Sequence, residues 1–130
     1  MKKKVLSLLL SAVMILSLAV PVSAVSVNSF SDVSPDSWYY ESVSYVAERD
    51  YMNGTSGTTF SPDDNMTRAM FATVISRVAG AEVDNSVQTD YTDVPAGMWY
   101  TGAVQWGTEN DLITGYGNGL FGTDDSITPT

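Results

Sequence analysis

The chain of 130 residues contains no cysteine and no histidine, and only six lysine or arginine residues. Without cysteine it forms no disulfide and has no site for a lipid anchor, so its stability must come from packing. Without either residue type, the usual nucleophile–base triads and tetrahedral zinc sites lack their parts. We therefore expect neither an enzyme nor a bound cofactor.

The first 24 residues are organised like a secretory signal peptide. They have a basic start at positions 2–4, an apolar run over positions 5–20 and small residues that end at Ala24. A membrane-spanning helix is the alternative, because the apolar run approaches spanning length. Pro21 and the small residues favour cleavage after Ala24, which would leave an exported chain without membrane insertion.

The chain after this segment is strongly acidic. Its basic residues are Arg49, Arg68 and Arg77, and against 15 acidic residues they give a net charge of 3 − 15 = −12. Such a charge repels both nucleic acid and anionic membrane surfaces. Nucleic acid is therefore excluded as a partner.

An internal repeat is the most informative feature of the sequence. The stretch "DVSPDSWYYESV" from Asp32 returns as "DVPAGMWYTGAV" from Asp93, an offset of 61 residues. The two copies align without a gap from Phe30 to Ala69, and 12 of these 40 pairs are identical. Repeats of fixed period indicate units that bury their apolar faces on their neighbours. We expect a signal peptide over 1–24, a first repeat over 25–80, a connector over 81–90 and a truncated second repeat over 91–130.

The first repeat has the pattern of a helix followed by a loop. Apolar residues with the spacing of one helical face predict a helix near 37–50, namely Tyr39, Val43, Val46 and Ala47. Residues 34–37 offer turn and capping chemistry before it. The following loop, rich in Gly, Asn and Asp, contains Phe60, which we expect to be buried.

A second helix is predicted from a cap at Thr67 to Ala79, with Gly80 as its stop. We expect its inward stripe to consist of Met70, Phe71, Val74, Ile75 and Val78. The second copy ends before this helix, so the apolar face from Tyr100 to Val104 should lack part of its cover. The fold class is therefore mainly α, with repeated helix–loop–helix units.

The stretch from Phe30 to Gly80 resembles an S-layer homology (SLH) repeat. It has the F-x-D-V opening, W-Y before an apolar helix, the glycine loop, F-x-P and T-R-A, and positions 91–128 resemble a second copy. The resemblance implies repeats that commonly occur in threes around a pseudo-threefold axis. It also implies an exported protein of a Gram-positive envelope, held non-covalently to secondary cell-wall polysaccharide that is often pyruvylated.

The sequence departs from the family pattern in three ways. Met70 stands where the family often has an acid, Pro129 replaces the second arginine, and a third copy is absent. The chain is either a natural short product or a fragment of a longer surface protein. Ile127 and Thr128 have the pattern of a helix start, which favours the fragment. We expect marginal stability or self-association, because neighbouring repeats stabilise one another.

The resemblance gives Arg68 the main anionic-ligand contact in a groove between repeats. A guanidinium suits this role because its donors can grip a carboxylate at two points. The alternative is a weak surface pair with Asp63 or Asp64. We expect replacement of Arg68 to weaken polymer binding and to change folding little.

Three further residues are candidate neighbours of Arg68. Trp38 could stack on a sugar ring, although an aromatic residue at a helix start is more often in the core. Asp32 matches an acid of the family, but a turn role explains it equally. Gly54, like Gly115, is expected for backbone angles that other residues resist.

Two other patterns have simpler explanations. Glu48 and Glu109 could form a glycosidase pair, but they follow the repeat and are expected as matched exposed helix residues. The acidic clusters at 63–65 and 124–125 lack the spacing of an EF-hand and are expected in turns. Two function classes remain: a wall-anchoring binding module, and a structural or self-associating part of a surface layer.

Overall fold

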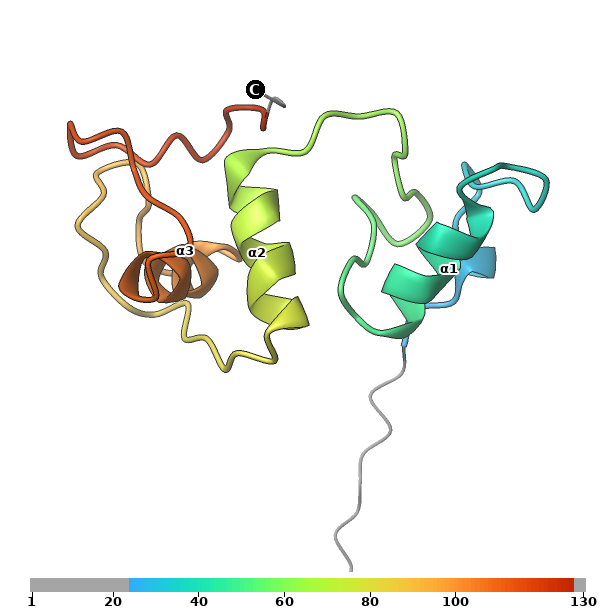
Figure 1. Ribbon diagram of the computed structural model, residues 1–130, viewed down its shortest axis with the longest axis horizontal. Coiled ribbons are helices and arrows are strands. Elements are labelled where there is room, and N and C mark those ends of the chain that lie inside the picture. Colours follow the sequence, from blue (N-terminus) through green and yellow to red (C-terminus); the bar gives the residue numbers. More distant parts are fainter. Residues whose placement is uncertain (1–23, 128–130) are drawn as a thin grey trace, which may run out of the picture.

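The computed structural model describes residues 24–127, so the predicted signal peptide lies outside the described residues except for Ala24. The elements are the short 3-10 helix η1 (Val27–Ser29) and the α-helices α1 (Tyr40–Glu48), α2 (Arg68–Val78) and α3 (Thr101–Glu109), joined by long loops (Figure 1). Residues 24–127 form no strand, only one antiparallel bridge between Thr67 and Ser126. The predicted mainly α fold is confirmed. None of the helices described is long and apolar enough to cross a membrane.

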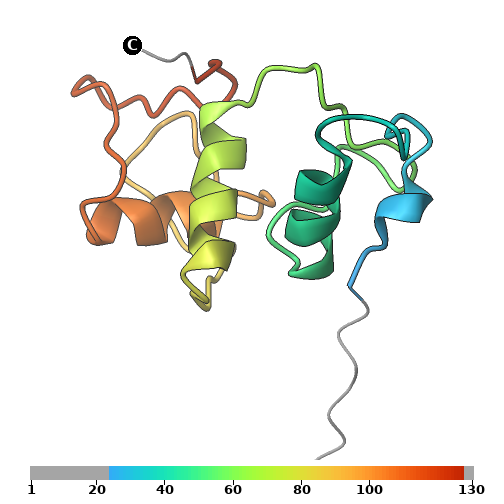
Figure 2. The same cartoon turned by 45° about the vertical axis from the view of Figure 1, so that its right-hand side comes forward.

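The helices pack across the boundary between the repeats. α2, which belongs to the first repeat, lies against α3 of the second, whereas α1 contacts η1 (Figures 1 and 2). One core consists of Val27, Phe30, Val33, Val43 and Ala47, and the other of Ala69, Ala72, Val94, Tyr100, Ala103, Val104 and Phe121. The packing unit is therefore offset from the sequence repeat, because the second helix of one repeat covers the first helix of the next.

Helix α1 is shorter than predicted. The residues before it form a turn in which Tyr40 N–H donates to the carbonyl oxygen of Ser37 at 3.1 Å. The N-cap is Tyr39, which makes no side-chain cap bond, so the predicted capping role of residues 34–37 is wrong while their turn role is confirmed. Val43 and Ala47 are buried as predicted.

Helix α2 begins and ends where the sequence predicts. The Thr67 hydroxyl accepts a hydrogen bond from Met70 N–H at 3.2 Å, and Gly80 adopts a φ of +66° after the last turn. The N–H groups of Arg68 and Ala69 donate to the carbonyl oxygens of Asp125 and Thr123, at 2.8 and 3.1 Å. The start of α2 is therefore tied to the second repeat.

The predicted inward stripe of α2 is wrong. The buried residues are Ala69, Ala72, Thr73 and Ser76, while Phe71 and Val78 are exposed. Small side chains at the contact let α2 approach α3 closely, and the larger apolar residues lie beside it. The buried hydroxyls are satisfied within the helix, since Thr73 donates to Ala69 O at 3.0 Å and Ser76 donates to Thr73 O at 2.8 Å.

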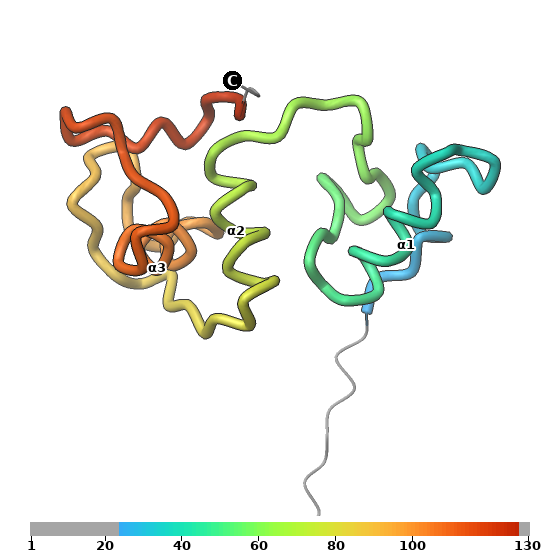
Figure 3. The backbone as a smooth tube through the Cα atoms, viewed as in Figure 1, coloured from blue at the N-terminus to red at the C-terminus, as the bar shows by residue number. Residues whose placement is uncertain are grey.

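The predicted loss of cover on the second repeat is also wrong. Tyr100 and Val104 are buried because α2 of the first repeat supplies the cover. The connector adds to it by wrapping past α3 (Figure 3), where Asn85 Oδ1 accepts a bond from Gly102 N–H at 2.9 Å. A Cβ at Gly102 would lie 2.8 Å from the backbone of Asp84, so only glycine fits this contact.

Phe60 is half-buried rather than buried. Its ring packs edge-on against the buried Phe30, with ring centroids 5.3 Å apart. Phe121, its counterpart in the second repeat, is fully buried because α2 covers that unit. The loops after α1 and α3 thus hold a phenylalanine at the same position of the repeat, but α2 covers the phenylalanine of the second repeat.

Candidate functional site

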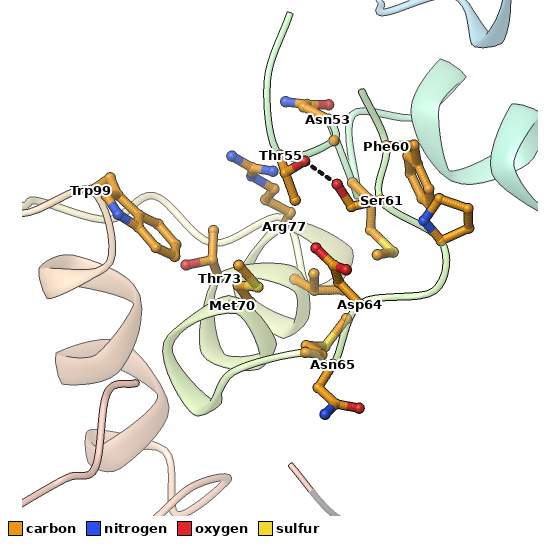
Figure 4. A pocket seen from close by; sticks show the side chains of 15 residues that line it. Asn53, Thr55, Phe60, Ser61, Asp64, Asn65, Met70, Thr73, Arg77 and Trp99 are labelled. Carbon is orange, nitrogen blue, oxygen red and sulfur yellow. Dashed lines mark hydrogen bonds between the residues drawn. The ribbon is translucent and has the colours of Figure 1, made fainter. Parts of the chain in front are cut away.

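A cavity of about 650 Å³ lies between α2 and the segment of residues 49–67 that joins α1 to α2, which we call the first loop (Figure 4). One wall comes from loop residues, among them Asn53, Gly54, Thr55, Ser61 and Asp64. The other comes from Met70, Thr73, Val74 and Arg77 of α2, and Trp99 of the second repeat also lines the cavity. We call this cavity the first groove, and it combines side chains of both repeats.

A second cavity of about 480 Å³ lies at the equivalent place in the second repeat. Its residues Ile113, Thr114, Tyr116 and Phe121 correspond, at the offset of 61, to Met52, Asn53, Thr55 and Phe60 of the first groove. Arg68 and Phe71 of α2 complete this second groove. Helix α2 therefore contributes to both grooves, with different residues.

Arg68 joins α2 to the second repeat. Its Nε donates to Phe121 O at 2.9 Å, and its Nη2 donates to Thr114 O at 2.5 Å. The guanidinium carbon also lies 4.7 Å from the ring centroid of Phe121 and 4.9 Å from that of Tyr116. These contacts, and not a pair with Asp63 or Asp64, hold the side chain at the second groove.

Asp32 closes the first loop. Its two carboxylate oxygens accept hydrogen bonds from Phe60 N–H at 2.8 Å and Ser61 N–H at 2.7 Å. The bond from Phe60 is the largest cause that lowers the pKa of this carboxyl. The structure therefore shows the turn role of Asp32.

Asp93 repeats this arrangement in the second loop, residues 110–127 after α3. It accepts from Phe121 N–H at 2.8 Å and from Gly122 N–H at 2.7 Å. Burial acts to raise the pKa of the Asp93 carboxyl, but the backbone donors together outweigh it and the pKa is lowered. The shared aspartate of the repeat is thus a loop-closing residue in both copies.

Gly54 lines the first groove with a φ of +80°, which confirms the predicted need for an unusual backbone angle. A Cβ there would also contact the carbonyl oxygen of Thr59 and the ring of Phe30. Gly115 has a different reason, because its φ is not positive and a Cβ would meet the ring of Tyr91 and the carbonyl oxygen of Leu120.

Trp38 lies on the surface with 91% of its area exposed, so the core alternative is wrong. It packs edge-on against Tyr39, with centroids 5.4 Å apart, and lines neither groove. Its counterpart Trp99 packs in the same way on Tyr100, is 53% exposed and lines the first groove. The aromatic residue of this groove therefore comes from the second copy.

The four predicted site residues do not form one cluster. Gly54 lines the first groove, Arg68 lines the second, and Asp32 supports the first loop through main-chain bonds. Arg77, which was not predicted as a site residue from the sequence, lines the first groove. The sequence does contain a pattern that places Arg77 with the other groove residues of α2, since positions 70, 73, 74 and 77 have the i, i+3, i+4, i+7 spacing of one helical face.

The acidic residues considered for other chemistry have structural partners. Glu48 accepts a bond from Ser44 at 2.8 Å, and Glu109 accepts one from Gln105 at 2.7 Å, both exposed and at matched positions. The acidic clusters lie in turns, where Asp64 N–H donates to Ser61 O and Asp125 N–H to Gly122 O. In the part of the chain described, no group of three or more acidic side chains is placed to hold a metal ion.

The fold and grooves define a helical repeat protein whose cavities are lined by residues of both repeats. The model of the S-layer homology domain matches residues 29–72 and 90–128, and the chain belongs to this family. This membership makes it a cell-surface anchoring module, located at the cell wall or cell surface.

Relatives include both surface proteins and enzymes. The chain is 31% identical to an S-layer protein of Bacillus thuringiensis subsp. finitimus, with 91% of the chain and 14% of the relative covered. It is 35% identical to an endoglucanase of Bacillus sp. (strain KSM-635), with 97% and 14% covered. It is 31% identical to a cellulosome-anchoring protein of Acetivibrio thermocellus, with 60% and 18% covered. The chain therefore spans less than a fifth of the length of these relatives.

Proposed function

We propose that the chain binds secondary cell-wall polysaccharide non-covalently through grooves between its repeats. The observation that carries this proposal is the composition of the first groove, which brings an exposed indole, polar side chains and a guanidinium together. An indole face suits the C–H surface of a sugar ring, while hydroxyl and amide groups suit sugar hydroxyls. A guanidinium suits a carboxylate, as a pyruvylated polymer would offer.

The polymer contacts of Arg68, Trp38, Asp32 and Gly54 remain predictions within this proposal. Arg68 retains further donors, because a guanidinium has five N–H groups and two of them donate to main-chain oxygens of the described residues. Gly54 keeps the first loop in the conformation that forms the groove wall. Asp32 acts on the polymer only through the loop that it closes.

We also infer that the chain has no catalytic role of its own. The relatives named as enzymes are much longer, and the chain corresponds to 14% of the endoglucanase. A shared non-catalytic module explains why S-layer proteins and enzymes both match the same family region. The module would attach different proteins to the same wall.

A structural, self-associating role is the second candidate. Its support is a set of exposed apolar side chains at or near the second groove, namely Phe71, Leu112, Tyr116, Leu120 and Ile127. Apolar surface of this kind marks contact sites for other proteins. A further SLH repeat or a second copy would be the partner.

Binding to purified walls separates the two candidates. The chain from residue 25 to residue 130 would be mixed with intact walls and with walls stripped of polysaccharide, and the pelleted fraction measured. The anchoring proposal requires binding to intact walls and loss of binding to stripped walls. Equal binding to both would leave the self-associating role as the better explanation.

A further inference from the structure

We infer that the first groove has its own anion contact, Arg77, and that it takes a carboxylate-bearing saccharide whose ring stacks on Trp99. The inference rests on the proposed function and specifies which residues of this groove carry it. Arg68, at the second groove, is not part of this site.

The distribution of positive charge singles out Arg77. Residues 24–127 contain three arginines and no lysine. The guanidinium carbon of Arg49 lies 3.6 Å from the ring centroid of Tyr45, and Arg68 donates to two main-chain oxygens. Arg77 is exposed, lines the first groove, and makes no side-chain hydrogen bond or ion pair with any residue that the structure describes. Its guanidinium is therefore the cation available to a ligand there.

The direction of the Arg77 side chain fits this role. Figure 4 shows it extending from α2 toward the first loop, on the side where Thr55 lies. Trp99 stands beside this part of the groove in the same view. A carboxylate held by Arg77 would therefore place the attached sugar ring within reach of the indole.

The opposite part of the groove carries negative charge. Asp64 lines it together with Asn65, away from Trp99 in Figure 4. A carboxylate on the ligand avoids Asp64, whereas sugar hydroxyls can donate to it. The two charges thus favour one orientation, with the ligand's carboxylate toward Arg77 and its hydroxyls toward Asp64.

Asn53 supplies a second, independent indication of a missing partner. Its Nδ2 donates to Asp50 Oδ1 at 2.6 Å, but its Oδ1 is buried without a hydrogen-bond partner among residues 24–127. A buried acceptor left unpaired is costly, and a sugar hydroxyl that donated to it after a small loop shift would remove that cost. Asn53 lines the same groove as Arg77.

The net charge of the chain does not prevent this binding. Repulsion between the acidic surface and an anionic polymer is screened over about 8 Å at physiological ionic strength. Within the groove the short-range contact with Arg77 dominates, because a hydrogen bond to a charged group is stronger than a neutral one. Affinity at the first groove should therefore depend on Arg77 far more than on the acidic surface charge.

The test compares two changes, one in the protein and one in the wall. Arg77→Gln removes the cation, and conversion of the wall carboxylates to neutral amides removes the anion. Binding of the 25–130 chain to intact and amidated walls is measured for the wild type, for Arg77→Gln and for the control Arg49→Gln. Melting temperatures of all three confirm that folding is unchanged.

We expect Arg77→Gln to lower affinity for intact walls roughly 10- to 100-fold. Amidation should lower wild-type and Arg49→Gln binding by the same factor and lower Arg77→Gln binding by a smaller factor, because Arg77→Gln has already lost its contact with a carboxylate. Trp99→Ala should also weaken binding to intact walls. An amidation effect on Arg77→Gln as large as that on the wild type would overturn the assignment of Arg77.

The failure of the proposed function gives a different result. In that case wild-type chain would bind intact and polysaccharide-stripped walls equally, whatever the residue at position 77. If Arg77→Gln lost polysaccharide-dependent binding and also melted at a lower temperature, Arg77→Lys would separate the binding defect from the folding defect. Lysine keeps the charge, so Arg77→Lys should recover part of the carboxylate-dependent binding. An Arg77→Lys variant that folds normally but shows no such binding contradicts the inference.

Discussion

The Nε of Arg68 donates a hydrogen bond to the carbonyl oxygen of Phe121 at 2.9 Å, across the boundary between the repeats. Together with the bond to Thr114 O, it fastens the start of α2 to the loop of the second repeat. The arginine of the T-R-A motif is therefore a structural link in this chain, whether or not it also contacts the polymer.

Replacing Arg68 should therefore destabilise the fold, contrary to the expectation from sequence. Arg68→Ala leaves the carbonyl oxygens of Thr114 and Phe121 without their donor, which should cost about 1–3 kcal/mol. Thermal unfolding followed by circular dichroism measures this change. Arg49→Ala, which removes an arginine stacked on Tyr45, is the control and should change stability by less than about 0.5 kcal/mol.

The ends of α2 were predictable from the sequence because their causes are local. Thr67 caps its own helix three residues on, and Gly80 ends it through its own backbone angle. The partners of Arg68 lie 46 and 53 residues further along the chain, so no local pattern indicates them. The same limit applies to the groove, since Trp99 reaches it from the other repeat.

The buried face of α2 was mispredicted for a related reason. A hydrophobic stripe indicates the buried face only when large apolar residues make the contact. Here the neighbouring helix lies close, so Ala69 and Ala72 are buried, with Thr73 and Ser76 satisfied inside their own helix. Met70 and Val74 line the first groove instead.

A larger side chain in the α2–α3 contact should lower the free energy of unfolding more than truncation of an exposed apolar residue does. Ala72→Leu adds volume where no space is open, since Ala72 is fully buried, and should cost roughly 1–3 kcal/mol. Phe71→Ala, next to it on the exposed side, should stay within about 1 kcal/mol. Denaturant unfolding compares the two, and the reverse order would support the originally predicted stripe.

The loop-closing aspartates should make stability depend on acid. The folded-state pKa values of Asp32 and Asp93 lie below their ordinary values, so their contribution is present above about pH 4 and is lost as the pH falls through the folded pKa. The melting temperature should therefore drop below about pH 4. Asp93→Asn should lower the melting temperature at pH 7 and flatten its decline in acid.

A matched variant tests whether this effect comes from loop closure. Asp124→Asn removes an exposed carboxylate of the second loop that accepts no hydrogen bond from the residues the structure describes, and it should leave the acid profile of the wild type intact. If Asp93→Asn kept the full acid dependence, the bonds from Phe121 and Gly122 would not be its source.

The apolar rim of the second groove should promote association. Leu112 is 56% exposed and Tyr116 is 53% exposed, and both line this groove beside Phe71 and Ile127. Contact with a further repeat or a second copy would bury this surface. We expect the 25–130 chain to show a mass that rises with concentration in size-exclusion chromatography with light scattering.

Leu112→Ser should reduce this association while leaving the melting temperature of the monomer nearly unchanged, because the side chain is already in contact with water. Val78→Ser, which removes an exposed apolar residue outside both grooves, is the control and should associate like the wild type. A strictly monomeric wild type, or equal effects of the two variants, would show that the second groove is not the contact surface.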